Sequence, residues 1–396
     1  MATRTPKFPV GIWVWMGKWV PHETDVRHQY IEKMFGKIAD LGCNLVVIGA
    51  DASEERRELM DRAHASNLRV IISCGNVHTW VRTGCVNDQA VKVVDVVDRE
   101  VEQFADHPAL AMYFINDIPG PTHIKRLASA TARFQELDPH HPTYVPYNYM
   151  TTPFWQVART PALSWDNFPV MQHTPPGILV NDSYNVGSTQ AEALREIATH
   201  TPEARHITLV QCWGYQPGEA RQRIPLLSDL RQQTFLAMAN GWTDGVIFYH
   251  YHSRYDSRPG GPMRYAIFNP DETLRVGPEK ELKSFINKIH TIGNALVGAQ
   301  VQEVRGIRPR WPVQAACFKR GQRRLLMLMS HDMTNTQNQK IDFHQLNTDC
   351  VTKVIDCVSG DSFVPQSSGE IELPLHLEPG DASLFEVFAQ TASDPD

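Results

Sequence analysis

The first 250 residues alternate between short apolar runs and longer amphipathic segments. The amphipathic segments place apolar residues at helical spacing, for example Tyr30, Met34 and Ile38, and predict helices over 23–41, 53–66, 88–105, 122–137, 189–200 and 227–239. The eight apolar runs have the length of buried strands and cover 10–15, 44–49, 68–74, 109–117, 143–147, 162–166, 207–211 and 245–250. Strands that alternate with helices form parallel βαβ units, and eight such units close a barrel.

The alternative is a doubly wound sheet, which usually carries a glycine-rich phosphate turn after its first strand. Here the first strand leads into Met16-Gly-Lys-Trp-Val-Pro21, which is not such a turn. The expected fold is therefore α/β, a TIM (β/α)8 barrel.

The pattern changes after a further amphipathic segment at 279–296. Short β-rich runs follow, separated by turn residues such as Ser359-Gly-Asp361 and Pro379-Gly-Asp381; the runs are 313–317, 324–329, 340–343, 351–355 and 383–387. We therefore expect two domains, a catalytic barrel over 1–296 and an antiparallel β-sandwich over 297–396.

Composition narrows the classes of protein. Hydrophobic residues make up 42% and charged residues 21%, which suits a globular core. The net charge of -6, without a dense Lys/Arg run, argues against a nucleic-acid partner, and no apolar run approaches the roughly 20 residues that span a bilayer. The seven cysteines lack C-x-x-C spacing, so neither a zinc ribbon nor a disulfide scaffold is suggested. No metal or cofactor is predicted. A cytoplasmic location is expected, or secretion if a signal peptide was removed. No oligomeric state is predicted.

Polar residues end several of the predicted strands, and the C-terminal strand ends carry the active site in this fold. Asn116 and Asp117 end the fourth strand, and Asp166 ends the sixth. Asp117 shares a strand face with Tyr113 and Ile115, so its carboxyl lies at the barrel mouth if that face points inward. The same holds for Asp166 and the face of Ser164. The alternative for Asp117 is a turn residue that binds the backbone before Pro119-Gly120.

Four segments resemble glycoside hydrolases whose catalytic domain is a (β/α)8 barrel of the clan A type. They are 107–119 (HPALAMYFINDIP), 163–169 (LSWDNFP), 209–214 (LVQCWG) and 231–249 (RQQTFLAMANGWTDGVIFY). Many such enzymes also carry a C-terminal β-sandwich. The resemblance implies a glycosidase with a carbohydrate substrate.

The chain departs from the family pattern at the catalytic positions. The fourth strand of the family usually ends Asn-Glu or Asp-Glu-Pro, with the Glu as acid/base. One alignment places Asp117 there, whereas the alignment anchored on Pro119 places Ile118 there. The seventh strand usually ends in the nucleophilic Glu, but this chain has Gln211. An amide cannot form a glycosyl-enzyme ester, so the usual retaining mechanism does not transfer.

Glycoside hydrolysis needs two carboxyls that flank one bond, and Asp117 and Asp166 are the candidate catalytic pair. Without a Glu on strand seven, one would act as acid and the other as base in an inverting reaction. Aromatic faces pack against sugar rings, and polar tips bind hydroxyls. The expected substrate-binding residues, all near strand ends, are Trp13, Trp15, Asp51, Asn116, Tyr147, Asn148, Gln211, Trp213, Tyr249, His250 and His252.

Two other functions stay open. A catalytically inactive carbohydrate-binding barrel would keep the cleft and place Ile118, rather than Asp117, in the mouth. A metal-dependent hydrolase would need His250 or His252 to converge with other ligands. Metal-dependent barrel hydrolases generally resemble one another in a His-x-His on the first strand, where this chain has Trp13-Val-Trp15. A hydrogen bond to sugar or a plain structural role is therefore preferred to a metal ligand for both histidines.

Overall fold

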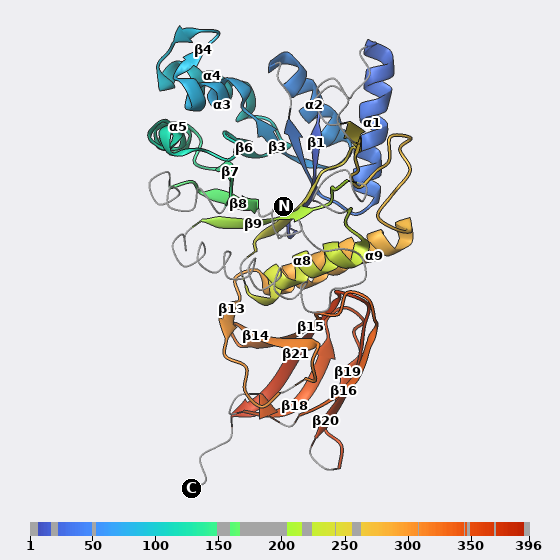
Figure 1. The fold of residues 1–396 in the computed structure, drawn as a ribbon. Coiled ribbons are helices and arrows are strands. Elements are labelled where there is room, and N and C mark those ends of the chain that lie inside the picture. Colours follow the sequence, from blue (N-terminus) through green and yellow to red (C-terminus); the bar gives the residue numbers. More distant parts are fainter. Residues whose placement is uncertain are drawn as a thin grey trace.

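A computed structural model of the chain shows a barrel at the top and an antiparallel sheet below it (Figure 1). The structure describes residues 7–16, 23–49, 53–148, 159–166, 204–215, 224–241, 243–255, 263–307, 309–343, 345–346, 349–367 and 370–391.

Eight parallel strands form a closed barrel in which the first strand pairs with the last, which confirms the predicted fold. Parallel strands that are neighbours in such a barrel are joined by crossover connections, the arrangement that gives them their outer layer of helices. In chain order the strands are β1 (Val10–Trp15), β2 (Leu45–Gly49), β3 (Arg69–Ser73), β6 (Leu110–Phe114), β7 (Thr143–Asn148), β8 (Ala162–Asp166), β9 (Arg205–Gln211) and β10 (Gly245–Tyr249).

The described helices cover the outside of the barrel, and all of them except α3, which was not predicted, correspond to predicted amphipathic segments. They are α1 (Thr24–Asp40), α2 (Ser53–Ala65), α3 (Gly75–Thr83), α4 (Val93–Phe104), α5 (Ile124–Leu137) after the short 3-10 turn η1 (Pro121–His123), α8 (Leu227–Ala239) and α9 (Glu279–Leu296). The helix expected over 189–200 lies outside the described residues.

The helix predicted over 88–105 begins later than expected. Asn87 and Asp88 both adopt positive φ (49° and 61°) and form the turn of a two-residue hairpin between β4 (Cys85–Val86) and β5 (Gln89–Ala90). Consecutive left-handed residues suit a tight hairpin turn rather than a helix start. As a result α4 begins only at Val93.

Each barrel strand buries both of its faces, in two separate cores. One core fills the barrel and includes Trp13, Val47, Phe114, Tyr144 and Ile247. The other lies between the strands and the surrounding helices. Successive side chains on a strand point to opposite faces. On each strand, the residues that face the barrel mouth are therefore those that alternate in step with the residues of the inner core.

The C-terminal region is an antiparallel β-sandwich, as predicted. Seven strands form the larger sheet: β13 (Gln300–Gln302), β14 (Val313–Arg320), β15 (Arg323–Ser330), β21 (Ala382–Thr391), β18 (Asp349–Asp356), β17 (Gln345–Leu346) and β19 (Ser362–Phe363). A second layer pairs β16 (Gln337–Phe343) with β20 (Ile371–Leu377). Side chains of both layers, among them Leu328 and Leu373, share one core.

Helices α8 and α9 lie between the barrel and the larger sheet (Figure 1). The opposite face of that sheet, with Phe318 and Met327, joins the core that surrounds the barrel. Lys288 of α9 also forms an ion pair with Asp381 (2.6 Å). The division into domains at residue 296 stays a prediction. Among the described residues, no helix is long and apolar enough to cross a membrane.

Candidate functional site

Trp13 forms the floor of the barrel mouth. Its side chain is 1% exposed, and its indole ring lies edge-on to Phe114 (5.0 Å between centroids) and to Tyr249 (5.2 Å). Trp15 lies one inward position further along β1, 5.6 Å from Trp13. Trp13 is thus part of the barrel core, while the partly exposed Trp15 and Tyr249 face the space above it.

The face of β6 that carries Tyr113 and Ile115 points outward. The Tyr113 ring packs on Phe134 of α5 (4.6 Å), and its hydroxyl donates to Asp138 (2.9 Å). Regular alternation along β6 would therefore point Asp117 outward with Tyr113 and Ile115, and not into the barrel mouth.

A one-residue bulge changes the direction of the chain at this point. Ile115 donates its N–H to Tyr144, so regular parallel pairing would have Asp117 donate to Pro146. Instead Ile118 donates to Pro146 (3.1 Å), which leaves one extra residue on the β6 side. Bulges redirect side chains and are frequent beside active sites.

Ile118, the residue that follows, has φ +45°, an unfavourable conformation for a β-branched residue. Such strain persists only where the surrounding structure holds it, and it is common at functional sites.

The charge of Asp117 acts on Tyr249 at the barrel mouth. The pKa of Tyr249 is raised to about 12, mainly because its hydroxyl is buried and also because the Asp117 carboxylate is negatively charged. Burial also raises the pKa of Asp117 itself, while the charge of Arg82 opposes this rise. Arg82 of α3 further donates to the main-chain carbonyl of Asp117 (3.2 Å). His78, on the same helix, lies edge-on to Phe114 (6.5 Å), and burial lowers its pKa to about 4.

Several buried polar atoms at the strand ends lack hydrogen-bond partners among the described residues. They are both amide atoms of Asn116, Oε1 of Gln211, Nε2 of His250 and Nε1 of Trp13. Leaving a buried polar group unpaired costs about 1–3 kcal/mol, so each calls for an explanation such as a bound ligand or water. All four residues belong to or directly follow β1, β6, β9 and β10.

Gln211 and Tyr249 are paired neighbours at the ends of β9 and β10. The Gln211 side-chain amide donates to the carbonyl of Trp213 (2.9 Å), which fixes its orientation and leaves Oε1 as the unpaired atom. His250 packs edge-on to Tyr249 (5.1 Å), and burial holds its pKa well below the usual value. A neutral imidazole and an amide oxygen are suited to binding sugar hydroxyls.

The structure does not bring Tyr147 and His252 to the mouth. Tyr147 occupies an outward position on β7, where its hydroxyl hydrogen-bonds to Thr160 (2.8 Å). His252 contacts Tyr30 of α1 through Nε2 (2.7 Å) and stacks on its ring, and burial lowers its pKa to about 4. Its neighbour Tyr251 likewise packs in the outer core. Alternation along the strand, or the turn beyond it, directs these side chains outward.

Three expected site residues are not described, or are described only in their main chain. Asp51 lies outside the described residues, as do the side chains of Asn148 and Asp166. The main chains of Asn148 and Asp166 pair directly at the ends of β7 and β8. Among the described residues, no group of three His, Cys, Asp or Glu side chains is placed to hold a metal ion.

A pair of arginines at the mouth was not anticipated from the sequence. Arg254 and Arg264 lie on a short antiparallel ribbon, β11 (Arg254–Tyr255) with β12 (Met263–Arg264), that follows β10. The Arg264 guanidinium covers one face of Trp213 at 4.3 Å, so that face is not open to sugar stacking. The only sequence signal was their position after the last barrel strand.

Gly49 leaves the space that Trp15 occupies. A Cβ at this position would overlap the indole ring, so Gly49→Ala is expected to displace Trp15 and to lower the free energy of unfolding by about 1–3 kcal/mol. Denaturant titration followed by tryptophan fluorescence measures both effects. The control is Gly36→Ala in α1, where a Cβ meets nothing within 4 Å and helix propensity predicts a gain of up to about 1 kcal/mol. An unchanged Trp15 environment in Gly49→Ala would contradict the assignment.

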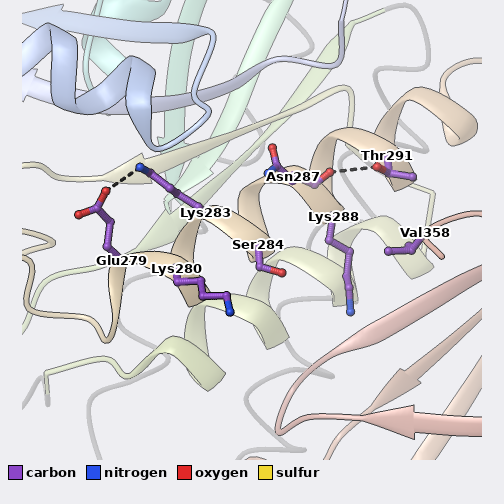
Figure 2. Close-up of a pocket in the computed structure, with 8 residues that line it drawn as sticks. All are labelled: Glu279, Lys280, Lys283, Ser284, Asn287, Lys288, Thr291 and Val358. Carbon is purple, nitrogen blue, oxygen red and sulfur yellow. Dashed lines mark hydrogen bonds and ion pairs between the residues drawn. The ribbon is translucent and has the colours of Figure 1, made fainter.

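A separate hollow of about 680 Å³ lies on α9 beside Val358, and none of the residues at the barrel strand ends lines it (Figure 2). Two of its three lysines are already in ion pairs, Lys283 with Glu279 (2.6 Å) and Lys288 with Asp381 (2.6 Å). It contains no convergent unpaired polar group among the residues that line it, and we do not assign the activity there.

Comparison with known proteins gives the class of fold. The sequence matches no protein-family model, and no curated protein matches it. Among solved structures, a glycoside hydrolase family 5 protein from Bacteroides vulgatus ATCC 8482 superimposes with a TM-score of 0.61 at 11% identity, covering 96% of this chain and 89% of that one. AmyP in complex with maltose gives 0.60 at 12% identity, covering 98% and 97%.

A further structure described as a glycoside hydrolase gives a TM-score of 0.59 at 11% identity, covering 98% of this chain and 94% of that one. The match therefore includes the barrel and the C-terminal sheet together. The resemblance to barrel glycoside hydrolases is confirmed for the fold, and at these identities it shows the fold alone.

Proposed function

We propose that the protein is a glycosidase that hydrolyses O-glycosidic bonds of an oligo- or polysaccharide, with Asp117 as general acid. The observation that carries this proposal is the position of Asp117. It follows β6, beyond the bulge, with its charge acting on Tyr249 across the mouth and its pKa raised by burial. A raised pKa extends the pH range over which a carboxyl keeps its proton, which favours a role as general acid.

Asp166 is the proposed general base. It ends β8, in register with Asn148, and so belongs to the same end of the barrel as Asp117. Gln211 stands where a retaining enzyme of this fold carries its nucleophile, and an amide cannot fill that role. Tyr249 is not a substitute, because a raised pKa disfavours the phenolate. Two carboxyls that activate a water would perform an inverting reaction, and inverting enzymes hold the two groups roughly 6.5–9.5 Å apart to leave room for that water.

The unpaired buried atoms support a polar ligand rather than an apolar one. Asn116, Gln211 and His250 together offer both donors and acceptors, and a sugar with several hydroxyls can satisfy them at once. Trp15 and Tyr249 supply partly exposed aromatic faces beside them.

The test is a screen for reducing-sugar release across a panel of glycans. We expect release from at least one glycan, with NMR showing inversion at the anomeric carbon. Release with retained configuration would contradict the proposed pair of aspartates. Binding without release from any glycan would instead support the inactive carbohydrate-binding barrel. Metal-dependent hydrolysis is not proposed, because Nε2 of His252 is bonded to Tyr30 and, in the part of the chain that the structure describes, no group of three His, Cys, Asp or Glu side chains could hold a metal ion.

A further inference from the structure

The side chain of Gln211 reaches the barrel mouth from the end of β9. It alternates in step with Ile207 and Leu209, which belong to the inner core, and the residue is 1% exposed. The side-chain amide nitrogen donates to the main-chain carbonyl of Trp213 (2.9 Å). A carbonyl oxygen only accepts hydrogen bonds, so the nitrogen must be the amide atom on that side, and Oε1 is the other atom.

The main chain of Gln211 is held by a second glutamine, Gln233 of α8. Oε1 of Gln233 accepts the N–H of Gln211 (2.9 Å), and its Nε2 donates to the carbonyls of Gln211 (3.3 Å) and Asp229 (3.2 Å). Among the described residues, the pairing of β9 with β8 ends at Thr208, so this amide takes the place of a strand partner. Because one side chain binds both main-chain groups of Gln211, the direction in which that residue projects its own side chain is fixed.

The residue after Gln211 is held in a similar way. The N–H of Cys212 donates to the carbonyl of Tyr249 (2.8 Å), and the carbonyl of Cys212 accepts from Nη2 of Arg275 (3.1 Å). Nη1 of Arg275 also donates to the carbonyl of Pro225 (3.2 Å), shortly before α8. The end of β9 is therefore bound by side chains from α8 and from the segment that follows β12.

Oε1 of Gln211 is consequently a buried acceptor in a fixed position, and it has no donor among the described residues. Leaving such an atom unpaired is unfavourable, so a ligand that fills the mouth is favoured if it supplies a donor there. A hydroxyl can donate, whereas an ether oxygen, a carboxylate or a fluorine atom cannot. The amide cannot turn over to offer its nitrogen, because Oε1 would then face the carbonyl of Trp213, acceptor against acceptor.

We infer that Gln211 recognises a free hydroxyl on the sugar bound at the mouth, and that Gln233 is the positioning residue that fixes this specificity. The substrate is then a glycan whose sugar keeps that hydroxyl unmodified. Sugars that are deoxygenated, O-alkylated or oxidised to a carboxylate at this position are rejected. This inference rests on the proposed glycosidase function.

The experiment compares sugars that differ at one hydroxyl. The probes are the methyl glycosides of glucose, galactose and mannose in both anomeric forms, with their monodeoxy and monodeoxyfluoro derivatives. Binding to the full chain is measured by NMR titration, and the penalty at a position is the ratio of the dissociation constants of derivative and parent sugar. For the sugar that binds best, we expect a position at which both derivatives show a penalty of about 10-fold or more, because each leaves Oε1 without a donor.

Gln211→Met identifies the position that Gln211 recognises. The variant lacks the acceptor, so the parent sugar should bind about 10-fold more weakly, and the two derivatives at that position should lose no further affinity. Penalties at positions bound by Asn116 or His250 should persist. The disappearance of one penalty alone is the signature of a direct contact.

Gln233→Glu tests the positioning role. It keeps an acceptor for the N–H of Gln211 and places a carboxylate oxygen against the carbonyls of Gln211 and Asp229. We expect the penalty at the Gln211 position to fall at least about 3-fold while the other penalties persist, which a general loss of stability would not produce. If this variant does not fold, Gln233→Met, which adds no charge, takes its place.

Gln339→Glu is the matched control. Gln339 makes the same pair of bonds to the main chain of Arg310 in the C-terminal region, accepting from its N–H (3.1 Å) and donating to its carbonyl (2.9 Å). The chemical change is therefore identical, and every penalty should stay as in the parent protein.

If no penalty disappears in Gln211→Met, the inference is overturned, and Oε1 is satisfied by a buried water rather than by the sugar. If one penalty disappears there but Gln233→Glu behaves like Gln339→Glu, the positioning role of Gln233 is overturned. Sugar release from a glycan would leave the proposed function intact in both cases. Binding and hydrolysis of no glycan at all would overturn the proposed function itself.

Discussion

Asp117→Asn is expected to lower kcat on an unactivated glycoside by at least about 100-fold and to leave the fold intact. General acid catalysis contributes typically 10²–10⁴-fold, and an amide of the same shape cannot release the required proton. Binding should persist, since the change removes a proton donor and keeps the size of the side chain. Turnover is measured with purified protein, and binding by calorimetry on the same preparations.

Two further measurements separate this role from a structural one. Substrates with activated leaving groups need little protonation, so they should lose much less activity in Asp117→Asn. The activity of the parent should fall as pH rises through the raised pKa of Asp117, and this limb of the pH profile should be absent from residual activity of the variant. Equal activity of parent and variant on an unactivated glycoside would defeat the assignment.

The barrel was predictable because strands buried on two faces appear as continuous apolar runs. The run at 245–250, for example, corresponds to β10 within one residue. The helix α3 was missed because Gly75-Asn-Val-His-Thr79 has poor helix formers at its start, and three buried residues on one face, Val77, Trp80 and Val81, stabilise it through packing. Tertiary contacts, absent from the local pattern, decide such a segment.

The strand β20 was also missed, and Pro374 in its middle explains why. Proline lacks a ladder donor, so a run that contains it is a poor candidate for a central strand. Among the described strands β20 pairs only with β16, and its other edge, which has no strand partner there, tolerates the proline. The number of partners of a strand is a property of the whole fold.

The strand ends that form the candidate site could be predicted from the sequence, but the directions of their side chains could not. Asn116, Gln211 and Tyr249 lie where the strand ends indicated, since in this fold the C-terminal ends gather in one place. The direction of each side chain depends on registers and bulges that involve the neighbouring strand. One extra residue in the pairing with β7 changes the alternation at Asp117, and ordinary alternation turns Tyr147 away.

Arg56→Met is expected to lower the free energy of unfolding by about 3–5 kcal/mol, because it leaves the carboxylate of Glu100 buried without its cation. The two side chains are 1% and 3% exposed and form two hydrogen bonds of 2.7 and 3.1 Å. Arg56 also donates to the carbonyl of Ser73 at the end of β3 (2.6 Å), so it ties α2 and α4 to the strand. Denaturant titration monitored by circular dichroism gives the loss directly.

The neighbouring Arg57 provides the matched control. It pairs with Asp106 on the surface, with side chains 43% and 72% exposed, and such a pair contributes at most about 1 kcal/mol, so Arg57→Met should have a small effect. The double variant Arg56→Met with Glu100→Leu should recover most of the stability, because no unpaired charge then remains. Losses of similar size in Arg56→Met and the double variant would show that packing, rather than the buried charge, dominates. Since Ser73 directly precedes the turn into α3, which carries His78 and Arg82, the single variant should also weaken glycan binding at the mouth.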